Sequence, residues 1–155
     1  MAVYRFETVW MFDNRIEPVW DAIRQTGNWP EWWRGVISVS ELRTGDKDGV
    51  GAIYHTIWKS RLPYRLEFDS EVLRVVQYRE IEVRAFGELE GSGLWQFETK
   101  GREVIVRYDW RVSTKKRWMN VIAPVARPLF KWNHDVIMAW GEAGLRSHIN
   151  DRQIL

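Results

Sequence analysis

The side chains that could move protons are few and lie far apart in the sequence. The candidates for acid–base catalysis are His55, His134, Asp135, Tyr54, Tyr64 and Tyr108, of which Asp135 should face solvent. His55 could act as a general base only if its side of a predicted strand points inward. For His134 a structural role, bonded to the backbone or to a strand residue, competes with a catalytic one. Because no acid and base pair stands out, the sequence leaves catalytic turnover open.

Other common chemistries are disfavoured by what the sequence lacks. The three histidines, His55, His134 and His148, are widely separated, and none stands four residues from a carboxylate or histidine in a metal-binding motif. With no cysteine, thiol catalysis and a disulfide framework are excluded. The chain also has no G-x-S-x-G motif and no phosphate-binding glycine loop. We therefore expect no metal site and no cofactor, and we disfavour a nucleophilic hydrolase or a nucleotide enzyme.

Asn133 is the strongest single polar signal, because it lies at the centre of an apolar stripe on the longest predicted helix, 118–149. It is either a core amide bonded to a strand carbonyl or a group that orients the polar end of a ligand; in both cases it should face inward. At about 100° per residue, the stripe residues lie within about 60° of Asn133. They are Trp118, Met119, Ile122, Ala126, Leu129, Phe130, Val136, Ile137, Trp140 and Gly144.

Pro124 and Pro128 should interrupt this helix, because each removes a backbone donor and crowds the carbonyl four residues earlier. We expect a short N-terminal piece followed by a long helix from about Pro128 to Ile149.

Length and charge predict one soluble, cytoplasmic domain over residues 1–155. The net charge is only +2, and Lys115, Lys116 and Arg117 are best explained as a solvated loop, so nucleic acid is not expected as a partner. No segment reads as a signal peptide or a membrane span. The oligomeric state is left open.

Eleven tryptophans are unusual for a chain of 155 residues. A core that only needed filling would use Leu, Ile and Val, since an indole N–H requires a partner. The tryptophans indicate either an aromatic-lined cavity or an aromatic-rich packed core.

The elements that must position these residues follow from hydrophobic periodicity. Residues 3–13 alternate as a strand, and two short helices follow, one around 16–23 and one through Trp32 and Trp33. Turn signals, among them LEG at 89–91, then separate further strands, which should be antiparallel neighbours. The strand at 51–59 is partly apolar on both faces, so its inward face is undetermined. The strands after the helices are 36–44, 51–59, 64–76, 79–88, 92–99 and 103–113.

This order resembles the helix-grip fold of the SRPBCC superfamily, the START and Bet v 1-like proteins. Within it, the chain is most similar to the branch of polyketide cyclase/dehydrase and lipid-transport proteins. The matching segments are IEPVWDAI, WPEWWRGV, GVGAIY, LPYRLEF, GELEGSGLWQFE and PLFKWNHDVIMAWGEAGL.

The resemblance implies an α+β fold with a seven-stranded antiparallel sheet curled around the long C-terminal helix and a hydrophobic cavity between them. The two short helices would form the cavity mouth, with Trp29, Trp32 and Trp33. One face of each of several strands and the apolar stripe of the long helix would supply its walls. The wall residues would be Phe6, Thr8, Trp10, Tyr54, Trp58, Tyr64, Phe68, Trp95, Tyr108, Trp110, Leu129, Asn133, Val136, Ile137 and Trp140.

Three functional hypotheses follow. The first is a carrier or sensor that binds a small hydrophobic molecule, such as a lipid or an aromatic, polyketide-like compound, in the cavity. The alternative is a polyketide cyclase or dehydratase-like enzyme that uses the same cavity. The third is an interaction module in which Trp29, Trp32 and Trp33 form an exposed docking patch.

Overall fold

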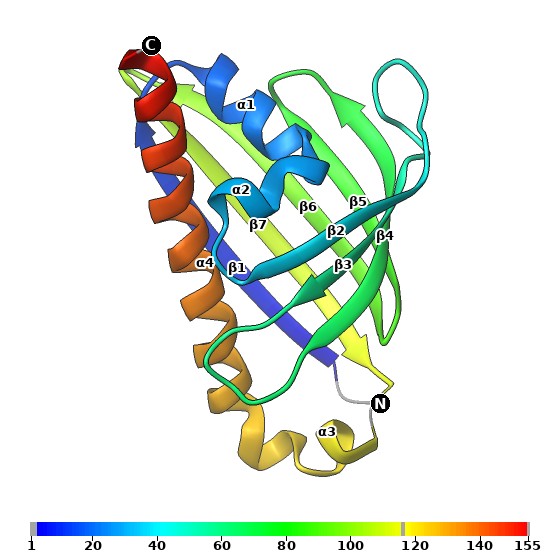
Figure 1. Cartoon of the computed structure of the whole chain (residues 1–155). Coiled ribbons are helices and arrows are strands. Elements are labelled where there is room, and N and C mark those ends of the chain that lie inside the picture. The colour runs from blue at the N-terminus through cyan, green and yellow to red at the C-terminus, as the bar shows by residue number, and fades with distance from the viewer. Residues whose placement is uncertain (1–2, 116, 155) are drawn as a thin grey trace.

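The fold consists of one curved sheet and a small set of helices (Figure 1). The computed structural model describes residues 3–115 and 117–154, so Lys116 of the basic triplet lies outside the described residues. In chain order the elements are β1 (Val3–Asp13), α1 (Ile16–Arg24), a 3-10 turn (Thr26–Asn28), α2 (Trp29–Trp32), β2 (Val36–Arg43), β3 (Ile53–Trp58), β4 (Leu66–Val76), β5 (Glu80–Gly87), β6 (Leu89–Lys100), β7 (Glu103–Thr114), α3 (Arg117–Val121) and α4 (Ala123–Ile154).

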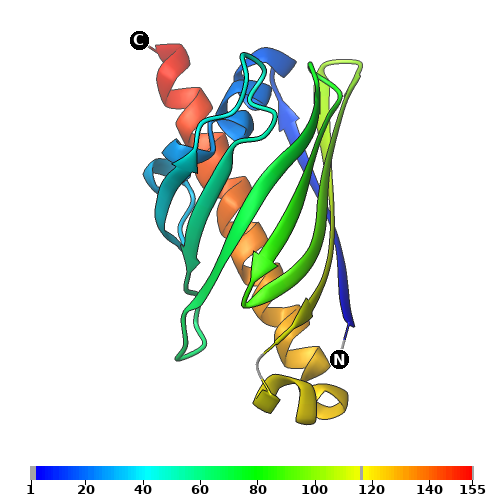
Figure 2. The ribbon, with the colours of Figure 1, turned by 90° about the vertical axis from the view of Figure 1, so that its right-hand side faces the viewer.

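The sheet has seven strands in the order β1-β7-β6-β5-β4-β3-β2, and every neighbouring pair is antiparallel. β2 to β7 pair in sequence order through short connections, while β1 joins the sheet at the far edge beside β7. The sheet curls but does not close, and α4 runs along its open side next to β1 (Figures 1 and 2). This confirms the predicted α+β helix-grip architecture.

The structure corrects one prediction about the strands and settles one point that the sequence left open. The predicted turn at 89–91 lies inside β6, because the β5–β6 hairpin turns around Glu88 and pairing resumes at Leu89. The undetermined face of β3 is now assigned. Tyr54 and Thr56 line a cavity on the inner side of the sheet, whereas the side chain of His55 contacts carboxylates on the outer side.

The predicted break near the prolines occurs earlier than expected. α4 begins at Ala123, so Pro124 lies in its first turn, where a backbone N–H has no helical partner and a proline is tolerated. Pro128 remains inside the continuous helix. The true interruption separates α3 from α4 at Ile122. Within the part of the chain that the structure describes, no helix is long and apolar enough to cross a membrane.

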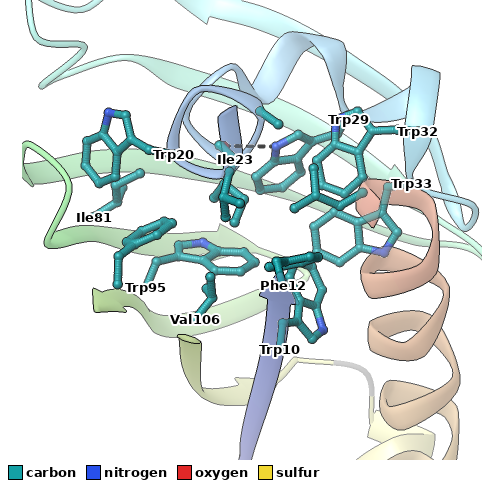
Figure 3. Packing of buried hydrophobic residues seen from close by; sticks show 14 of the residues in the cluster. Trp10, Phe12, Trp20, Ile23, Trp29, Trp32, Trp33, Ile81, Trp95 and Val106 are labelled. Atoms are coloured by element: carbon teal, nitrogen blue, oxygen red, sulfur yellow. Dashed lines mark hydrogen bonds between the residues drawn. The ribbon is translucent and has the colours of Figure 1, made fainter. Parts of the chain in front are cut away.

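Most of the core lies where α1, α2 and α4 meet the sheet (Figure 3). Trp33, the residue after α2, packs edge to face on both Trp10 of β1 and Trp95 of β6. Ring centroids of Trp10 and Trp33 are 5.3 Å apart, and those of Trp10 and Trp95 are 5.5 Å apart. A second cluster, around Phe68, Trp110 and Phe130, fills the other half of the molecule.

Candidate functional site

An apolar cavity of about 120 Å³ lies between the first half of α4 and the inner face of the sheet. Its walls come from β1, β3, β4, β6, β7, α2 and α4, so residues from the whole length of the chain meet here. The lining residues are Tyr4, Phe6, Trp29, Trp33, Trp58, Tyr64, Leu66, Phe68, Leu89, Trp95, Tyr108, Trp110, Val112, Thr114, Phe130, Asn133, His134, Ile137 and Met138.

A second cavity of about 300 Å³ adjoins the first beneath α1, the 3-10 turn and the β2–β3 loop. Polar groups lie toward that side, among them Arg24, Thr26 and Asp48. The two cavities share six aromatic residues, so only a layer of rings separates them. These shared residues are Trp29, Trp58, Phe68, Trp95, Tyr108 and Trp110.

Most indole N–H groups in this wall are satisfied by the protein itself. Trp29 donates to the carbonyl of Ile23 at 3.0 Å, a bond visible in Figure 3, and Trp33 donates to the carbonyl of Ile137 at 2.9 Å. Trp58 donates to the Thr56 hydroxyl at 2.9 Å. These bonds hold the rings in place, and the cavity surface that they form is largely apolar.

Within residues 3–115 and 117–154, the buried polar atoms of the cavity wall that lack a hydrogen-bond partner belong to two adjacent residues on α4. Asn133 Oδ1 and both ring nitrogens of His134 are buried, and none has a hydrogen-bond partner among the described residues. The imidazole of His134 stacks on Phe6 with centroids 4.4 Å apart. Its Nδ1 is 3.8 Å from Oδ1 of Asp135, which is too far for a hydrogen bond. Two adjacent residues therefore present unsatisfied polar atoms at the wall of the cavity.

Burial also sets the charge state of the cavity. Desolvation lowers the pKa of His134 to about 4; the nearby charge of Asp135 opposes this shift, and Lys131 adds to it. At neutral pH the imidazole is uncharged, with one donor and one acceptor nitrogen. Burial raises the pKa of Tyr108 far above its usual range, so its phenol is also neutral. The cavity thus offers neutral polar groups in an apolar surface.

Nine of the fifteen residues expected to form the walls line this cavity: Phe6, Trp58, Tyr64, Phe68, Trp95, Tyr108, Trp110, Asn133 and Ile137. Tyr54 lines the adjoining one. Leu129 was wrongly placed, because its side chain is 46% exposed. Trp10 does not line the cavity but packs against other indoles. Trp140 also lies outside the wall, with the guanidinium carbon of Arg34 4.1 Å from the centroid of the Trp140 ring. Thr8 and Val136 are half-buried and line neither cavity.

The errors on α4 share one cause. At about 100° per residue, the cavity-facing residues Phe130, Asn133, His134, Ile137 and Met138 centre about 60° from Asn133, on the His134 side. The true inward face is therefore rotated away from Leu129. This rotation also brings His134, expected at the flank of the stripe, into the cavity wall.

The structure also corrects the expectation that Trp29, Trp32 and Trp33 form the mouth of the cavity. Trp29, Trp32 and Trp33 are only 9%, 7% and 1% exposed, so they form neither an open rim nor an exposed docking patch. Trp29 and Trp33 line the cavity from inside, while Trp32 stacks on Trp33 with centroids 5.4 Å apart. α2 is too short to bury three indoles by itself, but α4 and the sheet enclose them.

His55 does not contribute to the cavity. Its Nδ1 is 2.6 Å from Oδ1 of Asp69, and its Nε2 is 3.1 Å from Oε2 of Glu67, both on β4. The hydrogen bond to Asp69 is the main cause that raises the pKa of His55, with Glu67 adding to it. This histidine lies on the outer side of the sheet, so the condition under which it could act as a base in the cavity, an inward-facing side chain, is not met.

Phe130 lines the cavity as a member of the predicted apolar stripe, whereas other lining residues were not expected: Tyr4, Leu66, Leu89, Val112, Thr114, His134 as a wall residue, and Met138. The alternation of the strands could have identified some of them, since Tyr4 is on the same strand face as Phe6, and Val112 is on the same face as Trp110. The sequence pattern could not have identified Leu89, because this residue was assigned to a turn. Among the residues that the structure describes, no group of three or more His, Asp or Glu side chains is arranged to hold a metal ion.

Solved structures show that this architecture is shared with proteins of very different sequence. An aromatase/cyclase, Zhui, from a Streptomyces species superposes with a TM-score of 0.76 at 12% identity, covering 97% of this chain and 96% of its own. A START superfamily protein from Mycobacterium smegmatis also reaches 0.76, at 10% identity and 95% and 97% coverage. Norcoclaurine synthase from Thalictrum flavum reaches 0.65, at 12% identity and 98% and 97% coverage. At such identities the likeness establishes the fold.

Sequence comparison establishes the family. No curated protein matches the sequence, but the family model described as polyketide cyclase / dehydrase and lipid transport matches residues 15–135. The matched segment includes α1, all of the strands after it, and the part of α4 that carries Asn133 and His134. The chain therefore belongs to the polyketide cyclase / dehydrase and lipid transport family.

Proposed function

We propose that the protein is a carrier or sensor that binds a small hydrophobic molecule, such as a lipid or an aromatic, polyketide-like compound, in the cavity beside α4. Family and fold point to hydrophobic ligand binding or cyclase activity. The observation that carries the narrower proposal is the unsatisfied polar pair, Asn133 Oδ1 and the His134 ring, in an otherwise apolar wall.

Burying such groups without partners is expensive. An unsatisfied buried donor or acceptor costs about 1–3 kcal/mol. A ligand with an apolar body and one hydroxyl would recover this cost, because the hydroxyl can donate to Asn133 Oδ1 and accept from the N–H of a neutral His134. The polar pair would then orient the ligand, and the aromatic wall would supply the binding energy.

The cavity at α4 by itself is close in size to one aromatic ring, and a ligand with two rings would need part of the adjoining cavity as well. A cavity of roughly 150 Å³ holds a benzene ring in a protein core, and the cavity at α4 has about 120 Å³. The adjoining cavity of about 300 Å³ lies behind the shared layer of aromatic rings. A ligand that displaces those rings would extend from the polar pair into the larger space.

Binding is favoured over cyclase catalysis by the proton affinities in the cavity. General acid–base catalysis works best when the catalytic pKa lies near the working pH. Burial lowers the pKa of His134 to about 4 and raises that of Tyr108, so both are poorly matched to proton transfer near neutral pH. Both groups are better suited to hydrogen bonding in a fixed protonation state.

Asn133→Leu tests the role of the polar pair, with 2-naphthol and naphthalene as calorimetric probes. We expect 2-naphthol to bind the wild type more tightly, and the substitution to weaken its binding by about 1–2 kcal/mol while naphthalene is unaffected. Stability should stay the same or rise, because Asn133 Oδ1 has no protein partner to lose and the substitution removes an unsatisfied buried acceptor. Asn150→Leu, an exposed site on the same helix, is the matched control.

The proposal is contradicted if Asn133→Leu lowers stability strongly and leaves the affinity for 2-naphthol unchanged. Native mass spectrometry of the protein purified from its host gives an independent test, because a carrier or sensor should retain a small apolar molecule. Turnover of a co-purified compound would instead favour the cyclase alternative.

A further inference from the structure

The end of the molecule formed by α3 and the first turns of α4 carries several exposed large apolar side chains. Figure 1 places both helices together at this end, near the start of β1. Elsewhere the exposed apolar residues are spread over separate strands. We call this the α3 end surface; its residues and exposed fractions are Trp118 (47%), Val121 (79%), Ile122 (42%), Val125 (86%), Leu129 (46%) and Trp132 (45%).

On α4 this surface forms a stripe of its own. Val125, Leu129 and Trp132 stand at i, i+4 and i+7, so they share one side of the helix. The centre of the side that lines the cavity, between Phe130 and His134, lies roughly 140° around the helix from the centre of this stripe. The stripe therefore has no role in the core, and an exposed apolar patch of this kind indicates an interaction site.

The segment that carries this surface has basic residues but no acidic residue of its own. Residues 110–134 contain no Asp or Glu but include Arg111, Lys115, Lys116, Arg117, Arg127 and Lys131. Three of these pair with acids from outside the segment: Arg111 with Asp109 at 3.6 Å, Lys115 with Glu90 at 2.8 Å and Lys131 with Asp135 at 2.7 Å. Arg117 is exposed on α3 itself. The surface is thus apolar with a basic surround.

Trp118 connects this surface to the interior. Although nearly half exposed, its ring packs edge to face on Tyr64, with centroids 5.7 Å apart, and against Phe130 at 6.4 Å. Both of these partners line the cavity beside α4. Whatever contacts the α3 end surface therefore lies one side chain away from the cavity wall.

We propose that the α3 end surface docks the protein onto anionic lipid membranes. An exposed apolar stripe with nearby basic side chains is the pattern by which helices lie in the membrane interface, where tryptophan is also favoured. A second copy of this chain fits less well, because a symmetric contact would bring the same cations against each other. The proposal does not depend on what the cavity binds.

Vesicle flotation tests this with phosphatidylcholine vesicles and with vesicles that also contain phosphatidylglycerol. The wild type should float with the mixed vesicles and lose binding as salt is raised. The double variant Val125→Glu with Leu129→Glu should bind at least about tenfold more weakly, and Arg117→Ala about fivefold more weakly. Because all three side chains are exposed, the variants should keep the wild-type melting temperature.

Two controls match these changes at other places. Leu42 on β2 is 58% exposed, so Leu42→Glu adds a charge at an apolar surface site away from the α3 end. Arg102→Ala removes a cation from the β6–β7 turn. Both variants should float like the wild type. The proposal is overturned if the wild type ignores both vesicle types or if the controls lose as much binding. It is also overturned if the α3 end surface instead mediates self-association in sedimentation velocity, abolished by the double variant.

Discussion

The buried imidazole of His134 should make the protein lose stability on mild acidification. The ring is uncharged in the folded protein because burial lowers its pKa from 6.5 to about 4. In the unfolded chain the same ring takes up a proton near its ordinary pKa. Between these two pKa values the unfolded state binds more protons than the folded state, so stability falls as the pH falls.

The magnitude follows from the difference in pKa. Each pKa unit corresponds to about 1.4 kcal/mol, and the pKa of His134 shifts from 6.5 to about 4. The full penalty is therefore about 3–4 kcal/mol; it is absent well above pH 6.5 and complete only at a pH well below the folded pKa. That is a large fraction of the stability of an ordinary domain.

His134→Gln removes the titration and keeps a polar side chain of similar size. Urea unfolding of both proteins should be measured at about pH 7.5 and about pH 4.5. Carboxylates and His55 titrate in both proteins, so their effects cancel in the comparison. On acidification, the wild type should lose about 2–3 kcal/mol more than His134→Gln. Equal losses in the two proteins would show that His134 is not held neutral by burial, and the account of the cavity would fail with it.

Two further predictions concern other parts of the structure. Asp69 and Glu67 raise the pKa of His55, so its ion pairs stabilise the fold below its ordinary pKa and are lost as the pH rises through the folded value. His55→Gln should therefore cost about 0.5 kcal/mol more at low than at high pH, and a pH-independent cost in urea unfolding would contradict this. A Cβ on Gly144 would lie 1.8 Å from the carbonyl oxygen of Trp32, so Gly144→Ala should separate α4 from α2 and destabilise by about 2–3 kcal/mol. Gly27→Ala, which meets no atom within 4 Å, is the control in thermal unfolding, and equal melting temperatures would refute the predicted contact.

The local pattern of the chain determined the elements and their order. Alternation along 3–13 and 103–113 predicts two half-buried strands, and these pair residue for residue from Val3 with Ser113 to Asp13 with Glu103. This works because a side-chain period of two is a property of the strand itself. The short connections likewise identified antiparallel neighbours. Phe68, Trp110 and Asn133 could be assigned to the cavity from this level of information.

Tertiary packing decided which of two acceptable faces turned inward. β3 is apolar on both faces, and only its pairing with β4 placed His55 beside Asp69 and Thr56 in the core. α4 has apolar side chains over more than half of its circumference, so spacing alone could not separate the cavity face of Phe130 from the exposed stripe of Leu129. In both cases the period of the element is local, but its rotation about its own axis is set by residues distant in sequence. For the same reason, the lack of partners for His134 could be recognised only from the folded chain.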